Sequence, residues 1–261
     1  MKTAIITGGS SGIGLEFARQ LAAKKFSLLL IAHDDDQLKN AARDLQEKFG
    51  TKVEILAGDL AEDKFIAKVC AQIRDTRNLE FLINCAGFGL HESLLDDSEK
   101  AFAKQNVAFK VMAQNVLEFS AIAAQKMKSR GRGKIINVAS TNAWLYSRNY
   151  SALKSWLVSY TEALAIELRG SGVFATAVAP SWMHTNFHRN AGLDKPSVPE
   201  FLFVKPEMVV QTTLRAAEEG KILHVPSVKW KIIIWCLAHG PRELSRFVSQ
   251  KYMNSKNYKN K

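Results

Sequence analysis

Short apolar runs alternate with longer segments of helical periodicity along almost the whole chain. The runs are continuously apolar, which is typical of strands that are buried on both faces of a parallel sheet. Helices that join such strands cover the two faces of the sheet. We therefore predict one α/β domain built on a doubly wound parallel sheet. Its strands are predicted at residues 2–7, 26–31, 52–57, 79–84, 135–140, 173–179 and 222–225, and its helices at residues 15–22, 37–49, 62–75, 98–129, 150–169 and 206–219.

Length and composition fit this architecture. The 261 residues are 47% hydrophobic, which is enough for one large core. The three cysteines have no metal-ligand spacing, so we predict no metal site and no disulfide framework, and expect a reducing compartment. The chain starts without the layout of a signal peptide, and it lacks the roughly 18 uninterrupted apolar residues of a membrane span. We therefore expect a cytoplasmic protein.

A glycine-rich turn joins the first predicted strand to the first predicted helix. Three glycines have the spacing G-x-x-x-G-x-G directly before that helix. Glycines let the backbone approach a phosphate closely, and the N–H groups of a helix N-terminus bind it. We interpret the turn as a cofactor-binding loop, over the alternative of a plain tight turn. The loop comprises Gly8, Ser10, Ser11, Gly12, Ile13 and Gly14.

A tyrosine and a lysine form a candidate acid/base pair. Tyr150 and Lys154 are four residues apart at the start of a predicted helix, so both side chains project from one face. A phenol has a pKa near ~10, and a cation one turn away favours the phenolate and lowers that pKa. Ser140 ends the preceding predicted strand, and we expect its hydroxyl to face the phenol. The pair could therefore act as a general acid and base.

With these motifs in this order, the chain resembles the short-chain dehydrogenase/reductase family over nearly its whole length. The resemblance rests on residues 7–14, Asp59-Leu60, Asn84-Cys85-Ala86-Gly87, Asn106, Ser140, Tyr150, Lys154 and residues 180–185. It is strongest to bacterial reductases related to fatty-ketoacyl and steroid-type reductases. The resemblance implies a Rossmann fold and hydride transfer between a nicotinamide cofactor and a carbonyl or alcohol carbon.

The family also implies roles for individual residues. Tyr150 would exchange the substrate proton, Lys154 would lower its pKa and bind the nicotinamide ribose, and Ser140 would hydrogen-bond the substrate oxygen. Asn106 would anchor a water next to Lys154, with an ordinary polar group at a helix kink as the alternative. Besides Tyr150, Lys154 and the glycine loop, the implied cofactor contacts are Asp59, Leu60, Asn84, Ala86, Gly87, Pro180, Met183 and Thr185.

One spacing and two residues depart from the family pattern. Ser140 and Tyr150 are only ten residues apart, so we expect a tightened loop over residues 142–149. Cys85 replaces a second asparagine, and Ser181 replaces a glycine, which puts a side chain near the nicotinamide.

The end of the second strand bears on the choice of cofactor. Ala32 stands where the family's NAD enzymes usually have Asp, and His33 stands where its NADP enzymes often have Arg. Three acids at 34–36 oppose a phosphate, and histidine is a pH-dependent cation. We expect NADP(H) rather than NAD(H), with His33 near the 2′-phosphate.

Aromatic side chains flank the expected substrate cleft and indicate a hydrophobic carbonyl substrate. The candidates are Trp144, Tyr146, Trp182 and Phe187, with Met183, Phe201 and Phe203 nearby. The irregular stretch 181–203 follows a strand's carboxyl end, where α/β sheets bind ligands, and is a candidate lid.

The basic charge of the chain is concentrated at its C-terminal end. Of the net charge of +11, the last 41 residues contribute nine Lys/Arg against one acid. Residues 229–248 combine apolar side chains with cations, a composition with which a segment could dock on a membrane surface. We favour packing on the domain or on a partner subunit, because Gly240-Pro241 cuts the segment short. We do not expect nucleic acid binding.

We divide the chain into a catalytic domain, residues 1–228, and a basic C-terminal segment, residues 229–261. By resemblance, a homodimer or homotetramer would form through the helices at 98–129 and 150–169. The alternative function is a non-catalytic nucleotide-binding or scaffolding protein, against which the Tyr150/Lys154 pair argues.

Overall fold

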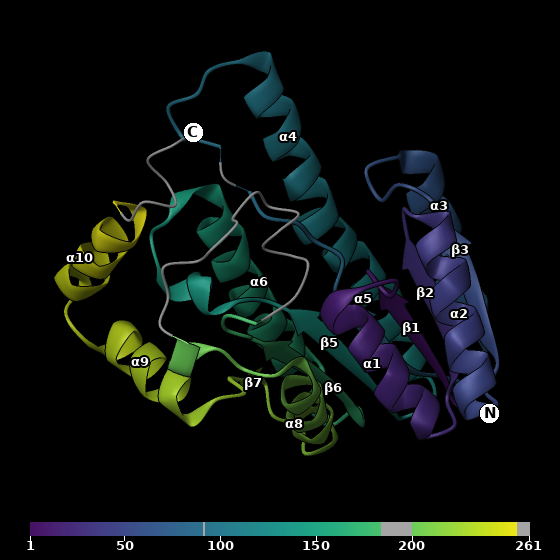
Figure 1. The fold of residues 1–261 in the computed structure, drawn as a ribbon. Helices are drawn as coiled ribbons and strands as arrows, with labels where there is room; N and C mark the ends of the chain where they lie inside the picture. The colour runs from purple at the N-terminus through teal and green to yellow at the C-terminus, as the bar shows by residue number, and fades with distance from the viewer. Residues whose placement is uncertain (91, 184–199, 255–261) are drawn as a thin grey trace.

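A single parallel sheet forms the centre of the molecule. The computed structural model describes residues 1–90, 92–183 and 200–254. Seven strands lie in the order β3-β2-β1-β4-β5-β6-β7 (Figure 1). They are β1 (Thr3–Thr7), β2 (Ser27–Ala32), β3 (Val53–Ala57), β4 (Leu79–Asn84), β5 (Gly133–Val138), β6 (Val173–Val178) and β7 (Leu223–His224). The predicted doubly wound sheet is therefore confirmed, and its strand order reverses between β1 and β4, where such sheets bind ligands.

Helices cover both faces of the sheet, as the continuous apolar runs require. Ile6 and Leu30 point to the face covered by α1 (Gly12–Ala23), α2 (Asp35–Phe49) and α8 (Pro206–Glu218). Ile5 and Ile31, one residue away along the same strands, point to the face covered by α3 (Asp63–Asp75), α5 (Asn115–Lys128) and α6 (Arg148–Glu167). Successive strand residues are thus buried on opposite sides, so no strand face is left for water.

The helix predicted at 98–129 is present but interrupted. It consists of α4 (Glu99–Phe109), a π turn over Lys110–Gln114 and α5. In the part of the chain that the structure describes, this is the one helix long and apolar enough to cross a membrane. About half of its most apolar window, 56%, is buried inside the domain, which is typical of a core helix.

Two short helices end the described chain. α9 (Val228–His239) and α10 (Arg242–Met253) meet at Gly240-Pro241, where the predicted break occurs. α9 packs on the domain through Ile234 and Trp230, and the Trp230 indole N–H donates to the carbonyl of Leu202 at 2.9 Å. Figure 1 shows α9 and α10 on the side of the molecule opposite α2 and α3.

Candidate active site

The glycine-rich turn after β1 has a backbone that only glycine accepts at several points. Gly8 and Gly12 have positive φ angles of 69° and 53°. A Cβ on Gly14 would lie 2.1 Å from the carbonyl oxygen of Gly8. The Thr7 hydroxyl accepts hydrogen bonds from the backbone N–H groups of Cys85 and Ala86, at 3.0 and 3.1 Å. The turns that follow β1 and β4 are therefore held against each other at the switch point.

The N-terminus of α1 is open to an anion. Its N-cap residue, Ser11, makes no side-chain capping bond, and the first turn contains no acid. Nothing lies within 4 Å of where a Cβ on Gly12 would be, so there is open space beside the turn. Backbone N–H groups at such a helix end bind phosphates. The turn therefore fits the pyrophosphate of a dinucleotide.

The residues after β2 and β3 lie at the same edge of the sheet. His33 is exposed, whereas Asp34 caps α2 by accepting a hydrogen bond from the Gln37 N–H at 2.9 Å. Asp35 pairs with Lys39 on the same helix at 2.5 Å. Two of the three acids beside His33 are thus already engaged by α2.

The turn after β3 presents an acid and hides its neighbour. Asp59 is exposed and accepts a hydrogen bond from the Ala61 N–H at 2.8 Å. Leu60 is buried, and its carbonyl accepts a hydrogen bond from the Asn115 amide on α5 at 2.8 Å. Asn115 therefore holds this turn in place, a contact that the sequence analysis did not predict.

The Asn84 side chain points into the interior. Its amide donates to the Ser120 hydroxyl on α5 at 3.0 Å and to Asn137 on β5 at 2.8 Å, and Asn137 donates to Thr161 on α6 at 2.9 Å. This buried polar chain ties two strands to two helices. Asn137 and Thr161 were missed by the sequence analysis, although a second asparagine in the strand before Ser140 was an available signal. Ala86 and Gly87 follow at the edge of the sheet, with Gly87 exposed.

Lys154 and Tyr150 are adjacent, as the helical spacing predicts. The Lys154 ammonium lies 5.6 Å from the centroid of the Tyr150 ring and donates a hydrogen bond to the carbonyl of Val138 at 2.8 Å. Only 6% of Lys154 is exposed. Burial lowers the pKa of Lys154 to about 8, and the nearby Cys85 opposes part of that shift. The amine is thus mainly protonated at neutral pH and sits beside the phenol.

Cys85 is a neutral thiol at the centre of the site. Burial raises its pKa to about 12, and the Lys154 ammonium offsets part of that increase. The residue that replaces an asparagine of the family pattern is therefore uncharged at neutral pH, and its thiolate would act on Lys154 only at high pH.

The shortened segment between Ser140 and Tyr150 forms a compact loop. A 3-10 turn over Thr141–Trp144 follows Ser140, whose hydroxyl accepts a hydrogen bond from the Asn142 N–H at 3.2 Å. The Thr141 N–H donates to the carbonyl of Pro180 at 3.0 Å, which joins the loop to the end of β6. Arg148 then begins α6 with a φ of 60°. The shortened loop between Ser140 and Tyr150 is thus closed by the 3-10 turn and by the left-handed backbone of Arg148.

Asn106 is exposed on α4. Ala101 and Ala108 mark the buried side of α4, and at 100° per residue Asn106 projects about 140° away from them, into solvent. Gln105 is the α4 side chain that reaches α6, since it accepts a hydrogen bond from Asn149 at 2.9 Å. The role of Asn106 as the anchor of a water beside Lys154 stays a prediction.

The segment after β6 adds a polar atom without a partner. The Ser181 hydroxyl is buried and has no hydrogen-bond partner among the described residues. Trp182 is buried between the rings of Phe203 and Tyr252, at 6.4 and 6.3 Å between centroids. Trp182 is therefore part of the packing under the C-terminal helices. Met183 is half-buried, and the predicted residues Thr185 and Phe187 lie outside the described part of the chain.

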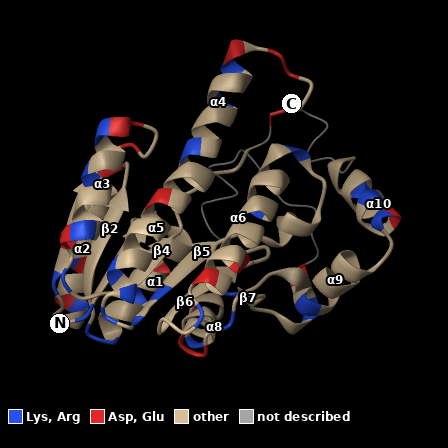
Figure 2. Cartoon of the chain, turned by 180° about the vertical axis from the view of Figure 1, so that it is seen from behind, with Lys and Arg blue, Asp and Glu red and all other residues tan. Residues whose placement is uncertain are grey.

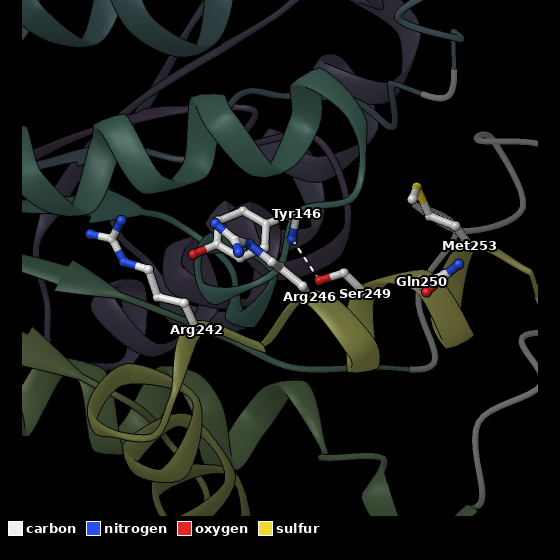
Figure 3. Close-up of a pocket in the computed structure, with 6 residues that line it drawn as sticks. All are labelled: Tyr146, Arg242, Arg246, Ser249, Gln250 and Met253. Atoms are coloured by element: carbon white, nitrogen blue, oxygen red, sulfur yellow. Dashed lines mark hydrogen bonds between the residues drawn. The ribbon is translucent and has the colours of Figure 1, made fainter. Parts of the chain in front are cut away.

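Tyr146 and Trp144 face the C-terminal helices. Figure 3 shows Tyr146 beside α10, where its backbone N–H donates to the Ser249 hydroxyl at 2.8 Å. Trp144 is half-buried and packs against Ile234 of α9 and its neighbours. The cavity at Tyr146 has a volume of about 420 Å³ and is lined by Tyr146, Arg242, Arg246, Ser249, Gln250 and Met253. α10 thus contributes to this wall, which the sequence analysis did not predict.

The parallel sheet brings the predicted groups to one edge. Each of these groups follows the carboxyl end of a different strand. The glycine turn follows β1, His33 follows β2, Asp59 follows β3, Ala86 follows β4, Ser140 follows β5 and Pro180 follows β6. A glycine turn that accepts a pyrophosphate, next to an ammonium and a phenol that can exchange a proton, is the arrangement of an oxidoreductase that uses a nicotinamide dinucleotide.

Comparison with known sequences identifies the family. The profile of the short chain dehydrogenase family matches residues 2–196, and the chain belongs to this family. It is an oxidoreductase that acts on CH–OH or C=O groups with NAD(P).

Relatives and solved structures agree with this assignment. A very-long-chain 3-oxoacyl-CoA reductase from Rattus norvegicus is 26% identical over 234 residues, which cover 85% of this chain and 72% of the relative. A 3-oxoacyl-acyl-carrier-protein reductase from Aquifex aeolicus is 27% identical over 244 residues, which cover 86% and 95%. A short-chain dehydrogenase from Sphingobium yanoikuyae in complex with NADPH superposes with a TM-score of 0.81 at 25% identity, over 89% of this chain and 92% of that one.

Proposed function

We propose that this enzyme reduces the carbonyl group of a hydrophobic substrate with NADPH, with Tyr150 as the proton donor. The observation that carries the proposal is the buried Lys154 ammonium 5.6 Å from the Tyr150 ring. A cation there stabilises the phenolate that remains after Tyr150 gives up its proton. A scaffolding protein would have no use for a buried charge at this place, and such a charge is costly.

The chain's own residues would divide the work as follows. The nicotinamide supplies the hydride when it is bound. The glycine turn and the N-terminus of α1 hold the pyrophosphate, and Lys154 donates to the nicotinamide ribose. Ser140 donates a hydrogen bond to the substrate oxygen, which gains negative charge during reduction, and Tyr150 protonates that oxygen.

Two features support NADPH as the cofactor. Asp34 and Asp35 are engaged by α2, through the Gln37 N–H and Lys39, so they oppose a 2′-phosphate near His33 less than their number indicates. The Sphingobium yanoikuyae enzyme has been solved with NADPH.

The substrate proposal draws on side chains and on relatives. Trp144 and Phe203 are half-buried aromatic residues; Trp144 lies in the turn that follows β5, and Phe203 contacts Trp182 in the segment that follows β6. Two relatives are named as 3-oxoacyl reductases. We therefore propose an apolar carbonyl compound and place 3-oxoacyl thioesters first among the classes to test.

The cofactor and substrate proposals can be tested together. Reduction of a panel of 3-oxoacyl thioesters, steroid ketones, aldehydes and sugars is followed by cofactor oxidation, and kcat/KM is measured with NADPH and with NADH. We expect the highest kcat/KM with NADPH and an apolar ketone. We expect His33→Arg to raise the ratio of kcat/KM with NADPH to kcat/KM with NADH further. A clear preference for NADH contradicts the cofactor proposal. Activity confined to small sugars contradicts the substrate proposal.

We further propose a cytoplasmic homodimer or homotetramer. Large apolar side chains are exposed on α4, α5 and α6, namely Phe102, Phe109, Leu117, Trp156 and Ile166. Such a surface is typical of a subunit interface. Cys70, Cys85 and Cys236 are free thiols, which suits a reducing compartment.

A further inference from the structure

The outer face of α9 is an apolar stripe. Val228, Ile232 and Trp235 are spaced at i, i+4 and i+7, so they share one side of the helix. They are 71%, 61% and 63% exposed. Trp230 and Ile234 lie on the opposite side and face the domain. The packing that the sequence favoured for this segment is therefore present, but it uses only half of an apolar helix.

α10 extends the exposed apolar surface. Leu244 and Phe247 are exposed, while Ser245 and Ser249 on the other side are buried. The Ser245 hydroxyl donates to the carbonyl of Leu237 at 2.9 Å and joins the two helices. The Tyr146 N–H donates to Ser249, so the pair of helices is also attached to the loop before α6.

Lysines flank this apolar surface. Helical periodicity places Lys229 and Lys231 on the two flanks of the α9 stripe and Lys251 on the same side of α10 as Leu244 and Phe247, whereas Arg242 and Arg246 line the cavity at Tyr146. Glu243 is the single Asp or Glu in residues 228–254. Figure 2 shows basic residues on both helices. Trp and Phe flanked by Lys and Arg are the composition of helices that lie in a bilayer interface.

We propose that α9 and α10 form a docking surface for an anionic lipid bilayer. Each helix has 12 residues and is therefore about 18 Å long, which is too short to span a bilayer but suits a helix lying in its plane. A second copy of the chain is a poor occupant, because a symmetric contact would bring Lys229, Lys231 and Lys251 of one copy towards the same cations of the other. An anionic surface attracts the same cations while the apolar side chains enter it.

Vesicle flotation with the full chain tests this proposal. We expect the protein to float with vesicles of phosphatidylglycerol and phosphatidylcholine, to float much less with phosphatidylcholine alone, and to be released by high salt. The double variant Ile232→Ser/Trp235→Ser should weaken vesicle binding on the order of tenfold or more, because it removes apolar surface without changing the net charge. The pair Lys229→Glu and Lys231→Glu should weaken it about 25-fold or more, since each lost cation is worth about fivefold.

A matched control separates position from net charge. Arg43→Glu and Lys48→Glu change the charge by the same amount on α2, which lies at the other end of the molecule in both views (Figures 1 and 2). We expect this pair to bind vesicles like the unaltered chain. Thermal unfolding and NADPH binding confirm that each variant is folded.

Three results would overturn the proposal. The unaltered chain fails to float with anionic vesicles at low salt, or the α2 pair loses as much binding as the α9 pair. The third result is that the chain does not bind vesicles and that the double variant Ile232→Ser/Trp235→Ser dissociates its oligomer. That result would assign the surface to a second copy.

Discussion

In the proposed mechanism, the burial that makes Lys154 costly for stability also makes it useful for catalysis. Only 6% of the residue is exposed, its ammonium donates to the carbonyl of Val138, and no carboxylate among the described residues forms a salt bridge with it. Burial disfavours the charged form, so the pKa falls from 10.5 to about 8. The charge that remains at neutral pH is poorly solvated, and it therefore acts strongly on the adjacent phenol.

Replacing this lysine should stabilise the folded chain while removing activity. We expect Lys154→Met to raise the free energy of unfolding at pH 7 by about 1–2 kcal/mol, because the cost of the buried charge exceeds the loss of its hydrogen bond to Val138. Below pH 8 both the folded and unfolded lysine are protonated and the full cost applies. Between pH 8 and 10.5 the folded state releases its proton first, so the stability of the unaltered chain rises with pH and the gap narrows. Urea unfolding from pH 7 to 10 measures the difference in unfolding free energy between the two chains, and a difference that widens with pH would contradict a lowered pKa of Lys154.

Ser181 gives a second prediction at this scale. Its buried hydroxyl lacks a partner among the residues that the structure describes, and an unsatisfied buried hydroxyl costs about 1–3 kcal/mol. We expect Ser181→Ala to stabilise the cofactor-free protein by about 1 kcal/mol and to weaken NADPH binding up to about tenfold, because the hydroxyl gains a partner from the cofactor. Thermal unfolding with and without NADPH measures both effects. A destabilised variant with unchanged NADPH affinity would show that the hydroxyl is already satisfied.

Single residues were predicted well where spacing alone decides their position. Tyr150 and Lys154 lie together because both are on one uninterrupted helix. The role of Asn106 stays a prediction, because it depends on contacts between α4 and α6 that the spacing along one helix does not define. Asn137 and Thr161 were missed because their partners come from other elements, and one chain segment does not reveal such contacts.

Among the elements, the glycine turn and the start of α1 require glycine for two separate reasons. Gly14 and Gly12 are both glycines of the same motif, but they are needed for different reasons. Gly14 is needed for space, because the carbonyl of Gly8 occupies the place of a side chain, whereas Gly12 is needed for its positive φ.

These two glycines should therefore respond differently to alanine. We expect Gly14→Ala to lower the free energy of unfolding by about 3 kcal/mol or more, because the methyl group would force the turn and helix apart. Gly12→Ala should cost only about 1 kcal/mol, the strain of a left-handed alanine, while it weakens cofactor binding by filling the space beside the turn. Urea unfolding and titration with NADPH give both quantities. Equal costs at the two positions would mean that the Gly14 contact is relaxed in solution.

Most strands and helices agree with the sequence within one or two residues, because their apolar periods are strong. The exceptions are informative. The 3-10 turn over Thr141–Trp144 and the π turn over Lys110–Gln114 were not predicted, since they depend on packing between elements. The two C-terminal helices were seen only as one segment with a break at Gly240-Pro241.

At the scale of the whole molecule, two exposed apolar surfaces differ in charge. The surface on α4, α5 and α6 fits a second copy, whereas that on α9 and α10 is basic.

The apolar surface of the long helices predicts self-association. We expect Leu117→Glu, on α5, to convert an oligomer to a monomer, because a buried unpaired carboxylate is costly at an interface. Light scattering after gel filtration measures the mass. A monomeric parent chain, or an unchanged mass for the variant, would contradict the proposed interface.

The central claim is that Tyr150 gives a proton to the substrate while the Lys154 ammonium stabilises the phenolate. The most direct measurement is the rate of carbonyl reduction by Tyr150→Phe, under conditions in which NADPH binding is shown to be saturated. The account predicts that cofactor affinity stays within a few fold, that the fold is unchanged and that kcat falls by about 10²–10⁴-fold. A variant that binds NADPH and reduces the substrate at the rate of the unaltered enzyme would contradict it.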